Sequence, residues 1–347
     1  MKSKISIFVA VLLIASFASA FAAGGTEAAA APSFSVGLVT DLGGIDDKSF
    51  NQGTWEGVVR FAKSINLVQG TGYKYLQSAA EADYVPNLST FADEKLDLIV
   101  APGFLFEQAM TEVADKYPNQ KLLLIDAVVT KPNVASAVFA EHEGSFLVGV
   151  AAGLKAKADG KDTVGFIGGM QFPLIERFQA GFEQGVKAVY PEATILVDYA
   201  GDFGAPDKGQ AIAQKQFNAG AYIIFHAAGG TGNGMIKEAK ERTEKGDIRW
   251  AIGVDKDQFT DGAYGSGKSA VLTSMMKRVD VAAHDVAKMV YENKFPGGQT
   301  LVFSLANNGV GIPETNPNLS ADIVAQVKEY GQKIASGALT VSEIPAK

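Results

Sequence analysis

The stretch FSVGLVTDLGGIDDKSFNQGTWEGVVRFAKS, residues 34–64, joins an apolar run to an amphipathic run through a polar, glycine-containing loop. The run FSVGLV has the continuous apolar character of a strand buried on both faces, and residues 49–64 have apolar side chains at helical spacing. Residues 40–57 also hold four carboxylates, a lysine, an asparagine and two aromatic residues. A loop between a strand and a helix is where open α/β sheets place their ligands.

The same strand-helix alternation continues along the chain. The predicted strands occupy residues 34–41, 72–79, 96–102, 121–129, 133–141, 162–169, 194–200, 221–229, 248–255, 270–276 and 300–306. The predicted helices include residues 49–64, 107–118, 143–158, 173–191, 208–220, 234–246 and 279–294. Such alternation predicts parallel sheets that helices cover on both faces. Two such sheets in series, without a long linker, predict a bilobed, doubly wound α/β protein.

The first 22 residues are organised like a secretory signal peptide. Lys2 and Lys4 precede an apolar stretch, and two small-x-small cleavage sites end at Ala20 and Ala22. The apolar stretch is shorter than the roughly 20 residues of a spanning helix, and an uncleaved anchor is the alternative. Residues 23–33 form a low-complexity spacer. We therefore expect export by a cleaved signal peptide to a periplasmic or extracellular location.

The amino-acid composition excludes several classes of function. The 347 residues include no cysteine, which excludes disulfides, thiolate catalysis and lipid attachment through cysteine. The 38 acidic and 31 basic residues give a net charge of −7 without a basic cluster, so nucleic acid is not an expected partner. About 315 residues follow the spacer, which is more than one core usually covers, so two lobes are expected.

Polar residues recur where predicted strands end. They are Asp41, Asp126, Asp198, His226 and Asp255. The carboxyl ends of parallel strands line one crevice, so these side chains are candidates for a shared site. Capping of the following helix is the alternative for each single aspartate.

Residues 262–269, GAYGSGKS, match the P-loop pattern, in which Lys268 would reach phosphates and Ser269 would hold magnesium. A P-loop requires a strand before it and a helix directly after it. Here the β-type run AVLTSMM follows and a polar segment precedes. We interpret the match as a glycine-rich connection between two strands, with no nucleoside triphosphate bound.

A second glycine-rich segment, residues 226–241, passes from a strand end into a helix through Gly229, Gly230, Gly232 and Gly234. Its spacing is not that of a dinucleotide fingerprint. Close backbone approach and free N–H groups at the helix start favour a platform for a polar, uncharged ligand. Tight packing alone is the alternative.

Catalytic motifs are not found in the sequence. The three histidines are scattered, and no G-x-S-x-G or H-E-x-x-H pattern occurs. Asp46 and Asp47 are adjacent and point apart, which suits acid–base chemistry badly. We expect no enzymatic activity, no metal and no cofactor. Phe50 lies at the start of a predicted helix beside the crevice, where its ring can stack on a planar ligand; Trp55 is a candidate core residue.

Several motifs in order resemble one family. They are VGLVTDLGGIDDKSFNQGTWEG, FIGG followed by ERFQAGFEQGVK, YAGDFGAPDKGQAIA, AAGGTGNG, IGVDKDQ and TSMMKRVD. Together they resemble the basic membrane protein family, the PnrA-like nucleoside-binding proteins of ABC importers, over essentially the whole mature chain. The resemblance implies a type I periplasmic-binding-protein fold, in which two Rossmann-like lobes with parallel sheets, joined by crossing strands, close on a nucleoside.

The resemblance also implies site residues by motif. Asp41, Asp47, Phe50 and Asn51 would hold the base side, Phe203 would be the second aromatic on the base, and Gly230, Gly232, Asp255 and Lys277 would address the ribose. We add Asp126 as the floor of the site. Members of the family are typically lipoproteins with a cysteine at the processing site; this chain has none, so we expect a free form without a lipid anchor.

The expected protein is thus a monomeric solute-binding protein that captures nucleosides, purine nucleosides first, for an ABC transporter permease. The predicted division is a signal peptide at 1–22, a spacer at 23–33, lobe N at 34–140 and 273–303, and lobe C at 141–272 and 304–347. A sugar-binding or sensory receptor of the same fold is one alternative. A secreted nucleoside hydrolase, which would release free base, is the other.

Overall fold

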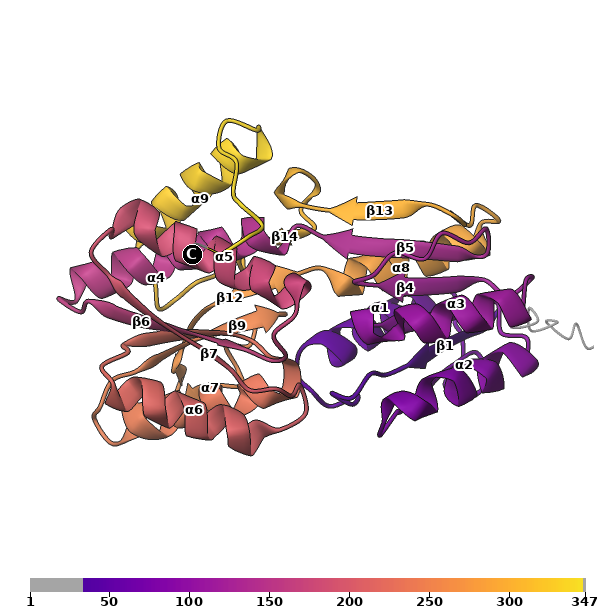
Figure 1. Ribbon diagram of the computed structural model, residues 1–347, viewed down its shortest axis with the longest axis horizontal. Helices are drawn as coiled ribbons and strands as arrows, with labels where there is room; N and C mark the ends of the chain where they lie inside the picture. Colours follow the sequence, from indigo (N-terminus) through magenta and orange to yellow (C-terminus); the bar gives the residue numbers. More distant parts are fainter. Residues whose placement is uncertain (1–33, 346–347) are drawn as a thin grey trace, which may run out of the picture. The chain divides into compact units, whose positions relative to one another are not determined.

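A computed structural model describes residues 34–345. The predicted signal peptide and spacer lie outside the described residues. The described residues form one compact unit. Within it, two six-stranded sheets follow each other, and each sheet with its helices is called a lobe below (Figure 1).

The first sheet is entirely parallel, with the order β13-β5-β4-β3-β1-β2. Its strands are β1 (Val36–Val39), β2 (Tyr73–Leu76), β3 (Leu98–Pro102), β4 (Leu122–Ile125), β5 (Val134–Phe139) and β13 (Thr300–Phe303). Helices α2 (Tyr84–Asp93) and α3 (Glu107–Lys116) cover one face, and α1 (Phe50–Ser64) and α8 (Val279–Tyr291) cover the other. Because both faces are covered, β1, β3 and β4 are buried along their whole length.

The second sheet has the order β14-β12-β9-β8-β6-β7, and only β14 is antiparallel to its neighbour. Its strands are β6 (Thr163–Gly168), β7 (Thr194–Tyr199), β8 (Ile223–Ala227), β9 (Trp250–Asp255), β12 (Val271–Lys277) and β14 (Val310–Gly311). Helices α6 (Pro206–Asn218) and α7 (Gly229–Glu244) cover one face. Helices α4 (Glu141–Ala158) and α5 (Pro173–Val189) cover the other, and α9 (Ala321–Ala335) packs on α4.

Taken in chain order, the first five strands of the two sheets have the same neighbours: β1 corresponds to β6, β2 to β7, β3 to β8, β4 to β9 and β5 to β12. The carboxyl ends of corresponding strands therefore carry corresponding loops. In such sheets a ligand crevice lies where the strand order reverses, beside β1 in the first lobe and β6 in the second. The predicted doubly wound α/β fold with two parallel sheets is confirmed.

The chain passes between the lobes three times: from β5 to α4, from β12 to α8, and from β13 to β14. The return segment was expected to begin at residue 273, but that residue lies inside β12, which pairs with β9 and β14. The passage to the first lobe comes only after Lys277, because α8 packs against α1. Segment 300–303 lies on the first sheet as β13, paired with β5.

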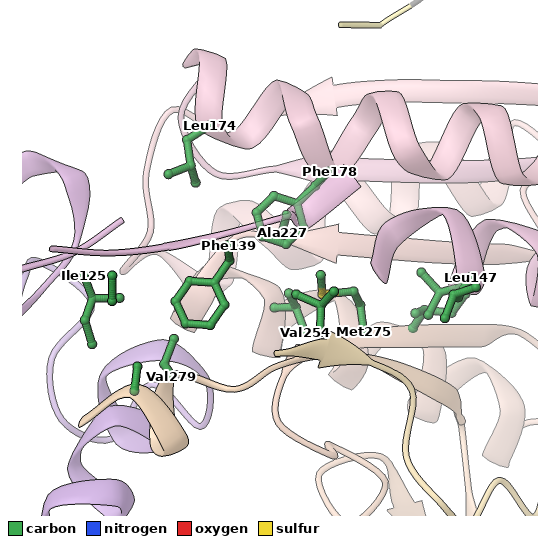
Figure 2. Packing of buried hydrophobic residues seen from close by; sticks show 14 of the residues in the cluster. Ile125, Phe139, Leu147, Leu174, Phe178, Ala227, Val254, Met275 and Val279 are labelled. Atoms are coloured by element: carbon green, nitrogen blue, oxygen red, sulfur yellow. The ribbon is translucent and has the colours of Figure 1, made fainter. Parts of the chain in front are cut away.

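A continuous apolar core runs from the inner face of one sheet to that of the other. Figure 2 shows Ile125, Phe139 and Val279 beside Phe178, Val254 and Met275 in this cluster. Separate clusters lie under α2 and α3 and under α6 and α7. The core thus connects the lobes beside the crossing segments. Of the helices among residues 34–345, none is both long and apolar enough to cross a membrane.

Candidate functional site

The strand ends of both lobes line a small cavity of about 50 Å³. This volume is well below the roughly 300–1,000 Å³ of typical small-molecule sites. The lining residues come from the loops after β1, β3, β4 and β7, from β8, β9 and β12, and from α1, α5 and α7: Asp41, Gly43, Asp47, Phe50, Asn51, Phe104, Asp126, Leu174, Ile175, Phe178, Phe203, Ala227, Ala228, Gly229, Val254, Asp255 and Lys277.

The loop between β1 and α1 is fixed by its own side chains. The Asp47 carboxylate accepts hydrogen bonds from the backbone N–H groups of Ser49, Asn51 and Gln52 at 2.8–3.0 Å. It therefore satisfies free donors at the start of α1, as a helix cap does. The Asn51 amide also donates to Asp47 at 3.0 Å. Asp47 thus lines the cavity, and its hydrogen bonds go to α1.

Asp41 holds the other end of this loop through one carboxylate oxygen. Its Oδ1 accepts from the Gly43 N–H at 2.9 Å and from the Asn51 amide at 2.7 Å. Among the residues described, no hydrogen-bond donor is assigned to Oδ2. Burial, only partly offset by the hydrogen bond from Asn51, raises the pKa of Asp41 to about 6.

Asp126 and Asp255 follow corresponding strands, β4 and β9, and have left-handed backbones with φ of 73° and 67°. Asp tolerates this conformation better than most residues. Asp126 Oδ2 accepts from Lys277, while Asp126 Oδ1 is buried without a partner. Asp255 Oδ2 accepts from the Ser49 hydroxyl. Burial raises the pKa of Asp126 to about 6 and that of Asp255 to about 7.

Lys277, at the end of β12, is the cationic residue of the lining. Its ammonium lies 2.6 Å from Asp126 Oδ2 and 3.1 Å from Glu141 Oε1, and the side chain is 2% exposed. Burial alone lowers the pKa of a lysine, but Asp126, Glu141 and Asp255 outweigh it and raise the pKa of Lys277. The rings of Phe50, Phe139 and Phe178 lie 5.1–5.4 Å from Nζ. Lys277 therefore stays charged inside an aromatic and acidic surround.

Aromatic rings from both lobes line the cavity. Phe50 begins α1 in the first lobe, and Phe203 follows β7 in the second. Phe104, after β3, lies edge-on to Phe203 at 6.2 Å. Phe104 also stacks on Phe172 of the second lobe at 4.5 Å with planes 9° apart. The lobes therefore meet through aromatic contacts beside the cavity.

Eight of the ten predicted site residues lie together in the lining, while Gly230 and Gly232 do not. Gly229 lines the cavity instead. A Cβ atom on Gly232 would lie 1.9 Å from His226 Nδ1, so this glycine serves packing against that ring. His226 is fully buried and bonds to Gln258, and Asp198 bonds to Lys215 and Gln216. Neither residue belongs to the lining.

The sequence prediction missed the apolar wall of the cavity: Phe104, Leu174, Ile175, Phe178, Ala227, Ala228 and Val254. It also missed Gly43 and the buried Glu141 behind Lys277. Leu174, Ile175 and Phe178 lie on one side of α5, so apolar spacing marked them as core residues. Phe104 comes shortly after β3, which ends at Pro102. This position near a strand end is the sequence feature that could have identified it as a site residue.

One sequence motif lies outside the site. Residues 262–269 form the short antiparallel pair β10 (Ala263–Tyr264) and β11 (Lys268–Ser269), followed by β12. This confirms the predicted glycine-rich connection between strands. A P-loop would require a helix directly after residue 269. Across residues 34–345, no group of three or more histidines, cysteines, aspartates or glutamates has the geometry of a metal site.

Known proteins share this arrangement over nearly the whole chain. A relative from Listeria monocytogenes, "CD4+ T-cell-stimulating antigen", is 46% identical over 90% of this chain and 89% of that protein. The "ABC transporter nucleoside-binding protein BmpA" of Lactococcus lactis is 36% identical over 92% of each chain. A crystal structure of an ABC transporter solute-binding protein from Aeropyrum pernix superposes with a TM-score of 0.79, at 28% identity over 88% of this chain and 92% of that one.

The family model described as "ABC transporter substrate-binding protein PnrA-like" matches residues 34–345. This span holds both sheets, the three crossing segments and every residue of the cavity lining. The relatives agree with it in extent, and the solved structure agrees with it in fold and in extent. The chain therefore belongs to the PnrA-like family of substrate-binding proteins of ABC transporters, with the type I periplasmic-binding-protein fold.

Proposed function

We propose that the cavity binds a nucleoside and that the protein delivers it to the permease of an ABC importer. The observation that carries the proposal is the composition of the lining. It combines aromatic rings from both lobes with three aspartates, Asp41, Asp126 and Asp255, each of which has one carboxylate oxygen that receives no hydrogen bond from the described part of the chain.

These groups match the two halves of a nucleoside. A planar base offers faces for Phe50 and Phe203, and base stacking on an aromatic side chain is worth about 1–3 kcal/mol. Ribose hydroxyls donate hydrogen bonds, and ionised carboxylates only accept them. Asp126 and Asp255 would accept from the ribose together with Lys277 as donor, and Asp41 would accept from an amino or imino group of the base.

The charge of the lining favours an uncharged ligand. Four aspartates and one lysine line the cavity, and Asp47 and Asp126 already have cationic or amide partners. A phosphate group would meet carboxylates in a buried site without an arginine in the lining. We therefore infer selection of nucleosides over nucleotides, with purine nucleosides as the first candidates.

Location and partners follow from the family. A substrate-binding protein of an importer works outside the cytoplasm, where it meets the solute and the permease. The relative from Lactococcus lactis carries the name nucleoside-binding protein, which supports the same ligand class for this chain. We infer capture without chemistry, because the matching family is described as substrate-binding proteins of ABC transporters.

Calorimetry on the purified protein tests the ligand class. The titrants are adenosine, guanosine, inosine, cytidine, uridine, ribose and adenosine 5′-monophosphate. We expect nucleosides to bind, and ribose and the nucleotide to bind far more weakly. Tight ribose binding without nucleoside binding would overturn the proposal. Asp255→Asn should weaken nucleoside binding, whereas the matched Asp115→Asn, 61% exposed on the surface, should not. Release of free base on incubation would contradict capture without chemistry.

A further inference from the structure

Three consecutive residues of the β1–α1 loop, 47–49, each form a hydrogen bond with the second lobe. The Asp47 carbonyl accepts from the Asn233 amide at 2.9 Å. The Lys48 carbonyl accepts from the Gln258 amide at 3.2 Å. The Ser49 hydroxyl donates to Asp255. This short segment is therefore held from α7, from the loop after β9 and from the end of β9 itself.

The backbone of the loop is shaped for these contacts. Lys48 has a φ of 58°, a left-handed conformation that few non-glycine residues adopt. Such conformations persist where surrounding contacts fix them. The Lys48 side chain also reaches the second lobe, with its ammonium 3.4 Å from Asp261 Oδ1. Directly after this segment come Phe50 and Asn51, which line the cavity.

Further contacts within the second lobe hold the two amide donors, Asn233 and Gln258, in place. Gln258 is fully buried, and its Oε1 accepts from the Val254 N–H at 2.9 Å and lies 3.0 Å from His226 Nε2. His226 in turn packs on Gly232 of α7, one residue before Asn233. The glycine-rich segment thus builds a rigid support for the donors. Neither Asn233 nor Gln258 lines the cavity.

We propose that Asn233 and Gln258 are positioning residues that clamp residues 47–49 when the lobes close, and so set ligand affinity without touching the ligand. The inference rests on the proposed function. The clamp acts on backbone carbonyls, so it recognises the closed arrangement of the two lobes and not the identity of the solute. The glycine-rich segment then serves lobe closure, and of its four glycines Gly229 is the one in the lining.

A clamp of this kind has a distinctive binding signature. The apparent Kd of every ligand rises by the same factor when the closed fraction of the free protein falls. Loss of one hydrogen bond predicts a factor of about three to ten. A residue that touches the ligand instead changes the ratio of affinities between ligands that differ at the contact.

The test uses Asn233→Ala, with Lys237→Ala as its control. Lys237 lies one turn further along α7, 59% exposed, and its amine is 3.9 Å from Glu241 of the same helix. Calorimetry with adenosine, guanosine and uridine should show all three affinities weakened about three- to tenfold by Asn233→Ala, with their ratios unchanged. Lys237→Ala should leave all three unchanged. A changed ratio, or no change in any affinity, would overturn the clamp.

A second readout is independent of any ligand. The chain has no cysteine, so spin labels can be placed at Val68→Cys and Ile248→Cys alone. These positions are exposed, one on each lobe, and double electron–electron resonance between the labels measures the distance between the lobes. Asn233→Ala should shift the ligand-free distribution toward longer distances, at an unchanged melting temperature. An unchanged distribution would overturn the clamp even if no nucleoside binds, whereas failure of the wild type to bind nucleosides overturns only the proposed function.

Gln258→Glu provides the matched isosteric variant at the second donor. It keeps the volume but removes the amide donor to the Lys48 carbonyl, so the same shift toward longer distances is expected. If its melting temperature falls, Asn233→Ala alone decides the test, because Asn233 is only partly buried.

Discussion

Asp126 and Asp255 end corresponding strands of the two lobes in the same left-handed backbone conformation. Each binds one neighbour through one carboxylate oxygen, Lys277 for Asp126 and Ser49 for Asp255. Strained conformations of this kind cluster at functional sites. The cavity is thus lined by one such aspartate from each lobe.

Phe50→Ala should weaken nucleoside binding about tenfold to a hundredfold, because base stacking on an aromatic ring is worth about 1–3 kcal/mol. Calorimetry measures the loss. Tyr291→Ala is the control, since Tyr291 is 42% exposed at the end of α8 and outside the cavity lining. Equal affinities for wild type and Phe50→Ala would exclude stacking on this ring.

Nucleoside affinity should rise with pH through the range of about 6 to 7. Burial raises the pKa of Asp255 to about 7 and those of Asp41 and Asp126 to about 6. Hydrogen bonds from a bound nucleoside favour the ionised carboxylates and lower these pKa values, so binding releases protons. Titrations between pH 5.5 and 8, in buffers of different ionisation enthalpy, measure both effects. Asp255→Asn should flatten the upper part of the profile; affinity that falls with rising pH would contradict the assignment.

At the scale of elements, the sequence predicted best what depends on local pattern. Each of the eleven predicted strands overlaps an observed strand, because parallel strands covered on both faces are continuous apolar runs. The prediction omitted α2, where Pro86 interrupts a short pattern, and α9. It also omitted the strands β10, β11 and β14, which have only two residues each. The cavity wall from α5 was missed since apolar helix positions do not reveal whether they face core or ligand.

Helix pairs approach closely through glycines. A Cβ atom on Gly185 of α5 would lie 2.1 Å from the Phe146 carbonyl oxygen of α4, and one on Gly57 of α1 would lie 2.1 Å from the Asp280 carbonyl oxygen of α8. Backbone atoms cannot move aside as a flexible side chain does. These glycines therefore fix how near the helices pack, and with them the apolar core between the lobes.

Gly185→Ala should destabilise the protein by at least about 1–3 kcal/mol, the usual cost of overpacking. The matched substitution Gly331→Ala in α9 should stabilise it by about 0.5–1 kcal/mol, because alanine is the better helix former. At Gly331 the added Cβ would meet Leu147 at an ordinary 3.6 Å. Urea unfolding of both variants gives the comparison; similar stabilities would mean that α4 and α5 separate easily.

At the scale of the whole molecule, the main feature is the apolar core that the two lobes share. Residues of both sheets belong to one apolar cluster, and three segments cross between the lobes. Which loops face each other depends on this tertiary arrangement. No local pattern predicts it, and the contacts of Asn233 and Gln258 with residues 47–49 were therefore absent from the sequence-based prediction.

The ligand-free protein should unfold in one calorimetric transition, because one apolar cluster includes residues of both lobes, beside the smaller clusters that belong to a single lobe. Agreement of the calorimetric and van't Hoff enthalpies is the criterion. A nucleoside at a hundred times its Kd should add about 2.7 kcal/mol to the free energy of unfolding and move that single transition upward. Two resolved transitions in the ligand-free protein would show that the lobes unfold independently.

The position of β13 has a consequence for how the chain is made. This strand covers the edge of β5, yet residues 300–303 are synthesised more than 150 residues after it. Until they emerge from the ribosome, β5, an apolar strand, is the open edge of the first sheet, and open apolar edges invite pairing with other chains. The first lobe therefore reaches its native strand order only near the end of translation.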